Sequence, residues 1–318
     1  MTVSTIILAA GKGSRMRSPT PKILHKIAGK HLIAFGVDLA KAVKSKETIV
    51  VVGNENERAT KVAISGEAIK FCTQKNQLGT ADAVRIALEG FKIKSKYTLI
   101  LYGDTPFIKN YTIKKMISKA DKGFEFIFLG FHARKNNSYG KFKLGPKGTL
   151  VDIIEKNEPK YNSPESLSNS GIVLARSSII ADLIQKVTNN NAKQEYYLTD
   201  IVKLAVKYGH SSTYVQCHED ECIGVNSQLE LSIAERKFQE DSRKKLMASG
   251  VSMLSPETCF FSHDTIIKSG CVIEPYVFIG TGVKIQSSTI IKSYSHIEGT
   301  HIGKNCQIGP IARLRPGT

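Results

Sequence analysis

Two hydrophobic patterns divide the chain. Up to about residue 225, short apolar or β-branched runs alternate with longer stretches of helical periodicity, which predicts an α/β domain with a mostly parallel sheet. Several runs are apolar throughout, as expected for strands covered on both faces. The predicted strands are 4–9, 48–52, 98–102, 126–131, 171–175 and 213–217, and the predicted helices are 32–42, 80–91, 112–120, 177–187 and 198–208.

Beyond residue 256 the pattern is a six-residue repeat. Isoleucine recurs every sixth residue from Ile267 to Ile297, and after a slip of one residue the spacing continues through Ile302, Ile308 and Leu314. Helical periodicity is absent there. The repeat predicts a parallel β-helix, in which each hexad forms one side of a triangular coil and its isoleucine points inward.

A charged stretch at 228–248 lies between the two patterns. Leu231, Ala234 and Phe238 recur in it at helical spacing, which predicts a helix. This helix either connects two domains or is one more surface helix of the first. The expected division is 1–227, a helical linker at 228–250, and 251–318.

Composition narrows the class of protein. Hydrophobic residues make up 41% and charged residues 23% of the 318 positions, which is ordinary for a globular protein. No apolar run approaches the ~20 residues that span a bilayer, so we expect no membrane partner. The six cysteines show no C-x-x-C spacing and no secretion signal precedes them, which favours reduced thiols in a cytoplasmic protein.

The net charge of +17 has two interpretations. It could indicate a nucleic-acid partner. However, lysines are scattered through every segment, with no block of like charges and no interleaved aromatic residues. The pattern therefore favours solvated lysine surfaces on a protein that handles phosphorylated metabolites, and we expect no nucleic-acid partner.

The first predicted strand leads into a glycine loop. Gly11 and Gly13 allow backbone N–H groups to close on a phosphate, because glycine has no Cβ. A dinucleotide-binding loop would contain a third glycine, whereas here Arg15 follows. A guanidinium matches phosphate oxygens bidentately, so the loop favours a triphosphate whose pyrophosphate leaves. The alternative is an ordinary turn with exposed basic residues.

Other polar residues follow predicted strands or open predicted helices. Asp104 follows the strand at 98–102, where a carboxylate suits Mg²⁺ or caps a helix. It should lie on the same side of the sheet as Gly11, since ligands bind beyond the carboxyl ends of such strands. Gln74 and the loop at 77–80 can read a uracil edge, or the loop simply starts a helix.

The middle and end of the α/β region contain further candidates. Gly140, Glu155 and Asn169 suit hydroxyl recognition on a sugar, since each buried polar group needs a hydrogen-bond partner, although each alone is more often structural. The segment at 224–226 offers a second metal ligand.

Together these segments resemble one family. They are LAAGKGSRM at 8–16, PK at 21–22, QLGTADA at 77–83, YGDTP at 102–106, YGK at 139–141, NSG at 169–171, NNNA at 189–192, EYYLTD at 195–200, GVN at 224–226 and ARLRPG at 312–317. In this order they resemble the bacterial bifunctional N-acetylglucosamine-1-phosphate uridyltransferase/glucosamine-1-phosphate acetyltransferase. The resemblance implies a Rossmann-like nucleotidyltransferase domain at 1–227 and the start of a left-handed hexapeptide β-helix, part of an acetyltransferase domain, at 251–318.

The resemblance also implies residue roles. Arg15 would stabilise the leaving pyrophosphate and Lys22 the charge around the reacting phosphate. Asp104 and Asn226 would hold Mg²⁺. The implied substrate-binding residues are Leu8, Ala9, Ala10, Gly11, Lys22, Gln74, Gly79, Thr80, Tyr102, Gly103, Asp104, Gly140, Glu155, Asn169, Asn226 and Arg315.

The implied reaction converts UTP and N-acetylglucosamine 1-phosphate to UDP-N-acetylglucosamine and pyrophosphate, for peptidoglycan and lipopolysaccharide precursors. Its nucleophile is already anionic, so catalysis is mostly positioning and charge neutralisation. The resemblance further implies a cytoplasmic homotrimer formed through the β-helix.

The chain departs from the family at three places. Ser14 replaces the usual threonine and Asp82 the more common histidine. The family's acetyl-transfer residues lie in coils later than Thr318, and only Arg315 resembles a ligand of that second site. We therefore expect acetyl-CoA to be a partner of the full-length protein only, and this end either to continue or to be covered by another chain.

Two alternatives stay open at this point. One is another sugar-1-phosphate nucleotidyltransferase, with a different nucleotide or sugar. The other is a non-catalytic scaffold related to translation-initiation exchange factors. The presence of Arg15, Lys22, Asp104 and Asn226 counts against the scaffold.

Overall fold

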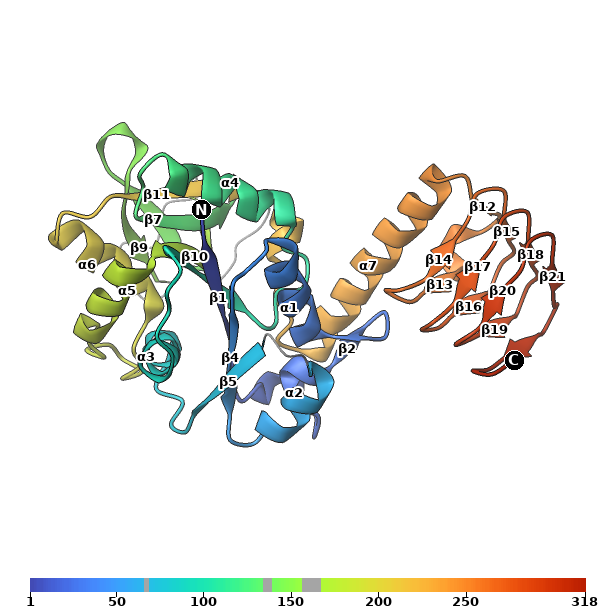
Figure 1. Ribbon diagram of the computed structural model, residues 1–318, viewed down its shortest axis with the longest axis horizontal. Coiled ribbons are helices and arrows are strands. Elements are labelled where there is room, and N and C mark those ends of the chain that lie inside the picture. Colours follow the sequence, from blue (N-terminus) through green and yellow to red (C-terminus); the bar gives the residue numbers. More distant parts are fainter. Residues whose placement is uncertain (66–68, 134–138, 156–166) are drawn as a thin grey trace. The chain divides into compact units, whose positions relative to one another are not determined.

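The computed structural model describes residues 1–65, 69–133, 139–155 and 167–318. They form two compact units, drawn in Figure 1 and described separately below. The first contains Met1–Leu24 and Leu32–Asn226, and the second contains His25–His31 and Ser227–Thr318. The short segment His25–His31 therefore belongs to the second unit. The division expected from the sequence consisted of contiguous ranges and placed this segment in the first domain.

The first unit is built on a nine-stranded sheet. Along its main path the strand order is β11-β7-β10-β6-β1-β4-β5, and every neighbouring pair is parallel except those made by β10. β8 pairs with β10 and β9. The mostly parallel α/β sheet is thus confirmed. The strands are β1 Val3–Ala9, β4 Thr48–Gly53, β5 Ile69–Gln74, β6 Tyr97–Tyr102, β7 Phe126–Phe131, β8 Lys141–Leu144, β9 Leu150–Ile154, β10 Ser168–Arg176 and β11 Ser212–Cys217.

Helices cover both faces of this sheet, which explains its fully apolar strands. On β1, Ile6 and Leu8 belong to the core packed beneath α3, α5 and α6, whereas Ile7 belongs to the core beneath α1 and α4. All seven residues of β1 are buried. The helices are α1 Leu32–Ala42, α2 Glu57–Ala63, α3 Thr80–Gly90, α4 Asn110–Asp121, α5 Ser177–Leu183 and α6 Ile201–Lys207.

Some elements differ from the sequence prediction. The helix predicted over 177–187 ends at Leu183 and continues as a 3-10 turn, and the one predicted over 198–208 begins with a 3-10 turn at Leu198–Asp200. The elements β5, β8, β9 and α2 were not predicted. β5 is an edge strand with only Gln74 buried, so its polarity resembles that of a loop.

The second unit contains α7, Gln228–Ala248, followed by stacked parallel strands. Three sheets, β12-β15-β18-β21, β13-β16-β19-β22 and β14-β17-β20, have the arrangement of a parallel β-helix. The predicted isoleucines are the second residues of these strands, and those from Ile267 to Ile302 are buried. The strands are β12 Ser252–Met253, β13 Phe260–Phe261, β14 Ile266–Ile267, β15 Val272–Ile273, β16 Phe278–Ile279, β17 Lys284–Ile285, β18 Ile290–Ile291, β19 His296–Ile297, β20 His301–Ile302, β21 Gln307–Ile308 and β22 Arg313–Leu314.

A small hairpin completes the second unit. Its strands β2, Lys26–Ile27, and β3, Lys30–His31, are antiparallel. The backbone N–H of Ala28 donates to the Glu235 carboxylate of α7 (2.7 Å), and the Ala28 carbonyl accepts from the backbone N–H of His263 (2.9 Å). Ile27 is fully buried. The hairpin is therefore a packed part of this unit.

Two further expectations can be compared with the described residues. All six cysteines carry free thiols in the structure. Within the described ranges, no helix combines the length and the apolar character that a bilayer crossing requires.

Candidate active site

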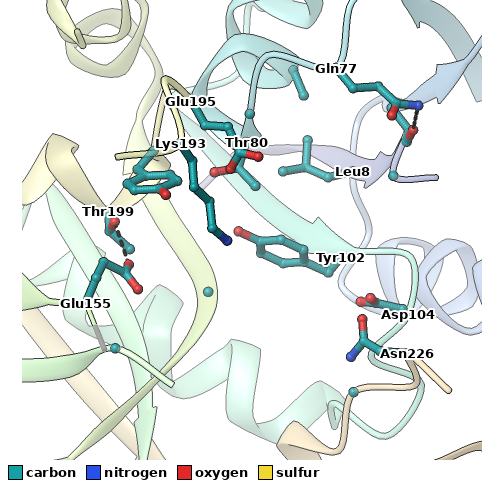
Figure 2. Close-up of a pocket in the computed structure, with 18 of the residues that line it drawn as sticks. Leu8, Gln77, Thr80, Tyr102, Asp104, Glu155, Lys193, Glu195, Thr199 and Asn226 are labelled. Atoms are coloured by element: carbon teal, nitrogen blue, oxygen red, sulfur yellow. Dashed lines mark hydrogen bonds between the residues drawn. The ribbon is translucent and has the colours of Figure 1, made fainter. Parts of the chain in front are cut away.

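The first unit contains a cavity of about 1210 Å³. It lies beyond the carboxyl ends of β1 and β6, whose register pairs Leu8 with Tyr102. The loops that follow these strands therefore start side by side, and Gly11 and Asp104 both line the cavity, as predicted. Figure 2 shows Leu8, Tyr102 and Asp104 among the lining residues.

Nearly all predicted site residues line this cavity. They are Leu8, Ala9, Ala10, Gly11, Arg15, Lys22, Gln74, Gly79, Thr80, Tyr102, Asp104, Gly140, Glu155, Asn169 and Asn226. Gly103 does not line it: its N–H donates to the Leu8 carbonyl (2.9 Å), and a Cβ there would lie 3.0 Å from Ile33 Cδ1, on the side of the core. Arg315 lies in an exposed turn of the second unit.

Close packing fixes the glycine loop. Gly13 has a φ of +64°, and a Cβ there would lie 2.6 Å from the Lys22 Cβ, so only glycine fits without displacement. The following 3-10 turn buries Met16, while Arg15 is exposed and lines the cavity. A Cβ at Gly11 would meet no atom within 4 Å. The loop thus presents an open backbone and a cation to the cavity.

Lys22 joins the two predicted metal ligands. Its ammonium forms an ion pair with the Asp104 carboxylate and donates to Asn226 Oδ1 at 3.0 Å. Asn226 is held there because the Val225 N–H donates to the Asp104 carbonyl (2.9 Å). Figure 2 shows the Asp104 and Asn226 side chains facing one another. This places one carboxylate and one amide oxygen around a cation.

The donor set of this pair suits a divalent metal. Carboxylate and amide oxygens are hard ligands, and Mg²⁺ typically takes one or two carboxylates and completes its shell with phosphate oxygens and water. Within the described ranges, no group of three or more His, Cys, Asp or Glu side chains could hold a metal by itself. The pair therefore fits a metal that is shared with a phosphorylated ligand.

A second loop is clamped by the segment at 195–200. Gly79 has a φ of +119°, and a Cβ there would lie 2.5 Å from the Tyr196 carbonyl oxygen. The Tyr196 N–H donates to the Leu78 carbonyl (2.7 Å), and the Leu198 N–H donates to Thr80 Oγ1 (3.0 Å). In the sequence this segment only preceded a helix, so its role as a clamp was missed.

The opposite wall carries the residues expected to read a sugar. Glu155 accepts a hydrogen bond from Thr199 Oγ1 (2.9 Å), drawn in Figure 2. The backbone N–H of Asn169 donates to the Gly140 carbonyl (2.7 Å), and a Cβ at Gly140 would lie 2.9 Å from Ile153 Cγ2. This wall therefore presents polar groups on closely packed backbone.

Tyr102 separates the two walls. Burial, together with the Asp104 charge, raises the pKa of its hydroxyl. The hydroxyl consequently stays protonated near neutral pH and can donate a hydrogen bond. A Cβ at Gly171 would lie 2.6 Å from the Tyr102 ring, so this glycine allows the ring to pack against the backbone of β10.

Sequence reasoning missed several lining residues. Among them are Lys193, Thr199, Asp200 and Lys203. Figure 2 shows the Lys193 side chain extending toward Tyr102. All four follow the NNNA segment or lie in or near the EYYLTD segment. In the sequence, only their position in or beside these two motifs could have indicated that they line the cavity, because their residue types alone do not.

The fold and this site define a nucleotidyltransferase. The family model of the MobA-like NTP transferase domain matches residues 5–156. Among curated relatives, the bifunctional protein GlmU of Bartonella quintana (strain Toulouse) is 39% identical over 316 residues, covering 99% of this chain and 70% of the relative. The bifunctional protein GlmU of Wolbachia pipientis wMel is 40% identical over 319 residues, covering 100% of this chain and 73% of the relative.

The chain belongs to the GlmU family. The resemblance found in the sequence is confirmed, and with it the N-acetylglucosamine-1-phosphate uridyltransferase function that it implied. A nucleotidyltransferase of this family uses a divalent metal and nucleotide-sugar substrates. The scaffold alternative has no support from these relatives.

Proposed function

We propose that the cavity of the first unit is the centre of uridylyl transfer from UTP to N-acetylglucosamine 1-phosphate. One observation carries this assignment. Nearly all of the residues that the sequence resemblance implies for substrate binding come from separate segments between Leu8 and Asn226, and they line a single cavity beyond the strand ends. A ligand that spans base, phosphates and sugar needs such an extended polar site.

The nucleotide occupies the side formed by the two loops. Leu8, Ala9, Ala10 and Gly11 bind it through the backbone, and Gln77 Nε2 ties this strand end to the second loop by donating to the Ala10 carbonyl (2.6 Å). Gln74, Gly79 and Thr80 line the uracil end. The sugar occupies the wall of Tyr102, Gly140, Glu155 and Asn169.

Asp104 and Asn226 are the proposed ligands of Mg²⁺. The Lys22 ammonium already shares their oxygens, so these oxygens attract a cation. A bound Mg²⁺ would supply charge neutralisation on phosphate oxygens. A metal held by these two residues would compete with Lys22 for their oxygens and would leave its ammonium available to a phosphate oxygen.

The reaction needs positioning more than proton transfer. The phosphate of N-acetylglucosamine 1-phosphate attacks the α-phosphorus of UTP, a P–O bond forms, and the bond to pyrophosphate breaks. The nucleophile is anionic, so a strong general base is unnecessary. Arg15 holds the leaving pyrophosphate, and Lys22 neutralises charge at the reacting phosphate.

The test is product formation with defined substrates. The purified chain with UTP, N-acetylglucosamine 1-phosphate and Mg²⁺ should release pyrophosphate and form UDP-N-acetylglucosamine. Chelation should abolish turnover, and added Mg²⁺ should restore it. Faster turnover with TTP, CTP or ATP, or with another sugar phosphate, would instead assign a different sugar nucleotidyltransferase.

Several broader features belong to the same proposal. The β-helix is left-handed, the protein is a cytoplasmic homotrimer, and the functional division is 1–227, 228–250 and 251–318. Neither nucleic acid nor membrane is a partner. Acetyl-CoA serves the second activity of the full-length family. Light scattering of the purified chain tests the trimer, and an acetylation assay on glucosamine 1-phosphate tests the second site.

A further inference from the structure

A buried polar cluster lies at the uracil end of the cavity. Gln74 is the last residue of β5 and is 4% exposed, and Asp82 in the first turn of α3 is 8% exposed. Gln74 Nε2 donates to the Gly79 carbonyl (3.0 Å) and to Asp82 Oδ2 (2.8 Å). Both hydrogens of the Gln74 amide are therefore used within the protein.

These partners determine which way the Gln74 amide points. A backbone carbonyl can only accept, and a carboxylate accepts, so the NH₂ group must face Gly79 and Asp82. Among the described residues, none donates to Gln74 Oε1, and the side chain lines the cavity. The side chain consequently presents only a hydrogen-bond acceptor to a ligand.

Both partners are themselves held in place. The Gly79 carbonyl cannot rotate freely, because the loop packs against the Tyr196 backbone and the Ala81 N–H donates to the Tyr196 carbonyl (2.9 Å). The guanidinium of Arg85 lies 3.8 Å from Asp82 Oδ1 and over the Tyr196 ring, 4.6 Å from its centre. The Asp82 carboxylate therefore has a cationic partner, Arg85, on the side away from Gln74, and this ion pair helps to orient it.

We propose that Asp82 is a positioning residue that sets base selectivity by locking the Gln74 amide with its carbonyl toward the cavity. This inference rests on the proposed uridylyl-transfer function, in which Gln74 faces the base. Uracil offers an N3–H donor to such an acceptor, whereas cytosine offers an N3 lone pair. The lock thus favours uracil and also excludes cytosine by acceptor–acceptor repulsion.

The test is nucleotide binding by the Asp82→Asn variant. Asparagine keeps the size of the side chain but can turn either its oxygen or its NH₂ toward Gln74, so one of the two enforced acceptors is lost and only the Gly79 carbonyl still favours the original orientation of the amide. The ratio of CTP to UTP dissociation constants, measured by calorimetry with Mg²⁺, should fall about ten-fold, as for the loss of one enforced hydrogen-bond preference.

Two further variants separate positioning from a general structural effect. Glu89→Gln, also on α3 but exposed, changes the charge in the same way and should leave the binding ratio unchanged. In a Gln74→Ala background the ratio should already be low, and adding Asp82→Asn should not lower it further, because the two residues act as one unit.

The outcomes distinguish this inference from the proposed function. An unchanged ratio in Asp82→Asn, or an equal fall in the Gln74→Ala background, would overturn the inference. So would a wild-type chain that binds UTP and CTP equally. If the wild type prefers UTP, loses that preference in Asp82→Asn, and yet forms no UDP-N-acetylglucosamine, the inference stands and the proposed reaction fails.

Discussion

The two units use their buried positions in opposite ways. In the β-helix, isoleucine recurs at the same position of successive hexads, and neighbouring coils make equivalent contacts. In the α/β unit, the cavity residues come from distant segments, and each has its own partner, such as Lys22 with Asp104 and Asn226. In the β-helix the stabilising contacts are therefore spread over many equivalent positions, whereas the chemistry of the cavity depends on a few contacts that occur once.

This contrast can first be tested by truncating one repeated isoleucine. Ile291→Ala should lower stability by ~2–5 kcal/mol, because it empties a fully buried position in the third strand of one β-helix sheet. Hydrogen exchange followed by mass spectrometry should localise the added opening to residues 251–318. Turnover of UTP, assayed well below the unfolding temperature, should be retained.

The neighbouring residue provides a matched control. Ile290 lies on the same strand, points outward and is 37% exposed. Ile290→Ala removes the same atoms from a partly solvated site and should cost much less than Ile291→Ala. Equal losses for the two variants would contradict the inward-facing repeat.

The opposite behaviour is expected at the cavity. Arg15→Ala should reduce kcat/KM by ~10²–10³, the usual loss when one preorganised contact to a charged transition state is removed. Arg15 is exposed, so the unfolding temperature should not change. Steady-state pyrophosphate release and calorimetry measure the two quantities.

Arg17 is the control for general positive charge. It is also exposed and lies two residues further along, but it does not line the cavity. Arg17→Ala should retain turnover within a few-fold. Comparable losses in both variants would indicate a diffuse electrostatic effect and not a contact to the leaving group.

A buried carboxylate in the α/β unit should have an intermediate effect. Glu221 is 1% exposed and accepts from Thr112 Oγ1 (2.6 Å), Tyr111 Oη (2.9 Å) and the Lys109 N–H (3.2 Å). Glu221→Gln leaves a donor without its acceptor and should cost ~1–3 kcal/mol in denaturant unfolding. Asp182→Asn, which breaks an exposed ion pair with Lys186, should cost far less.

The smallest effect is a pH dependence in the β-helix. Hydrogen bonds from the Ser293 N–H (2.9 Å) and hydroxyl (3.0 Å) lower the pKa of Glu274. A carboxyl with a lowered pKa in the folded state stabilises the protein above its unfolded pKa and loses this contribution as pH falls through the folded value. The Tm difference between wild type and Glu274→Gln should therefore be largest near neutral pH and shrink in acid. A Tm difference that stays constant across this pH range would show that the charge of Glu274 does not contribute to stability.

The β-helix could be predicted almost residue by residue from the sequence. Its register follows from a single spacing, and the slip between Ile297 and Ile302 was visible because the repeat surrounds it. Helix α7 was also predicted with its observed bounds, since its periodicity lies between two different patterns.

The α/β unit could be predicted only in part. Its apolar strands and the residues that follow them indicated one edge of the sheet, because parallel strands place their carboxyl ends together. The cluster of Gln74, Gly79 and Asp82 could not be predicted, since its hydrogen bonds depend on how a strand end meets a helix start. The clamp by Tyr196 was missed for the same reason: its contacts are mostly made by backbone atoms, which residue types do not reveal.

The hairpin at His25–His31 has a consequence for modularity. It is encoded within the α/β segment but packs with the second unit, where Ala28 bonds to Glu235 and His263. A gene cut once near codon 227 would therefore leave a fragment with a solvent-exposed Ile27 and unpaired hairpin groups. If homologues exchanged only the part after residue 227, the hairpin and the β-helix unit would come from different parents and would have to fit one another. Recombination should therefore keep both segments from the same parent.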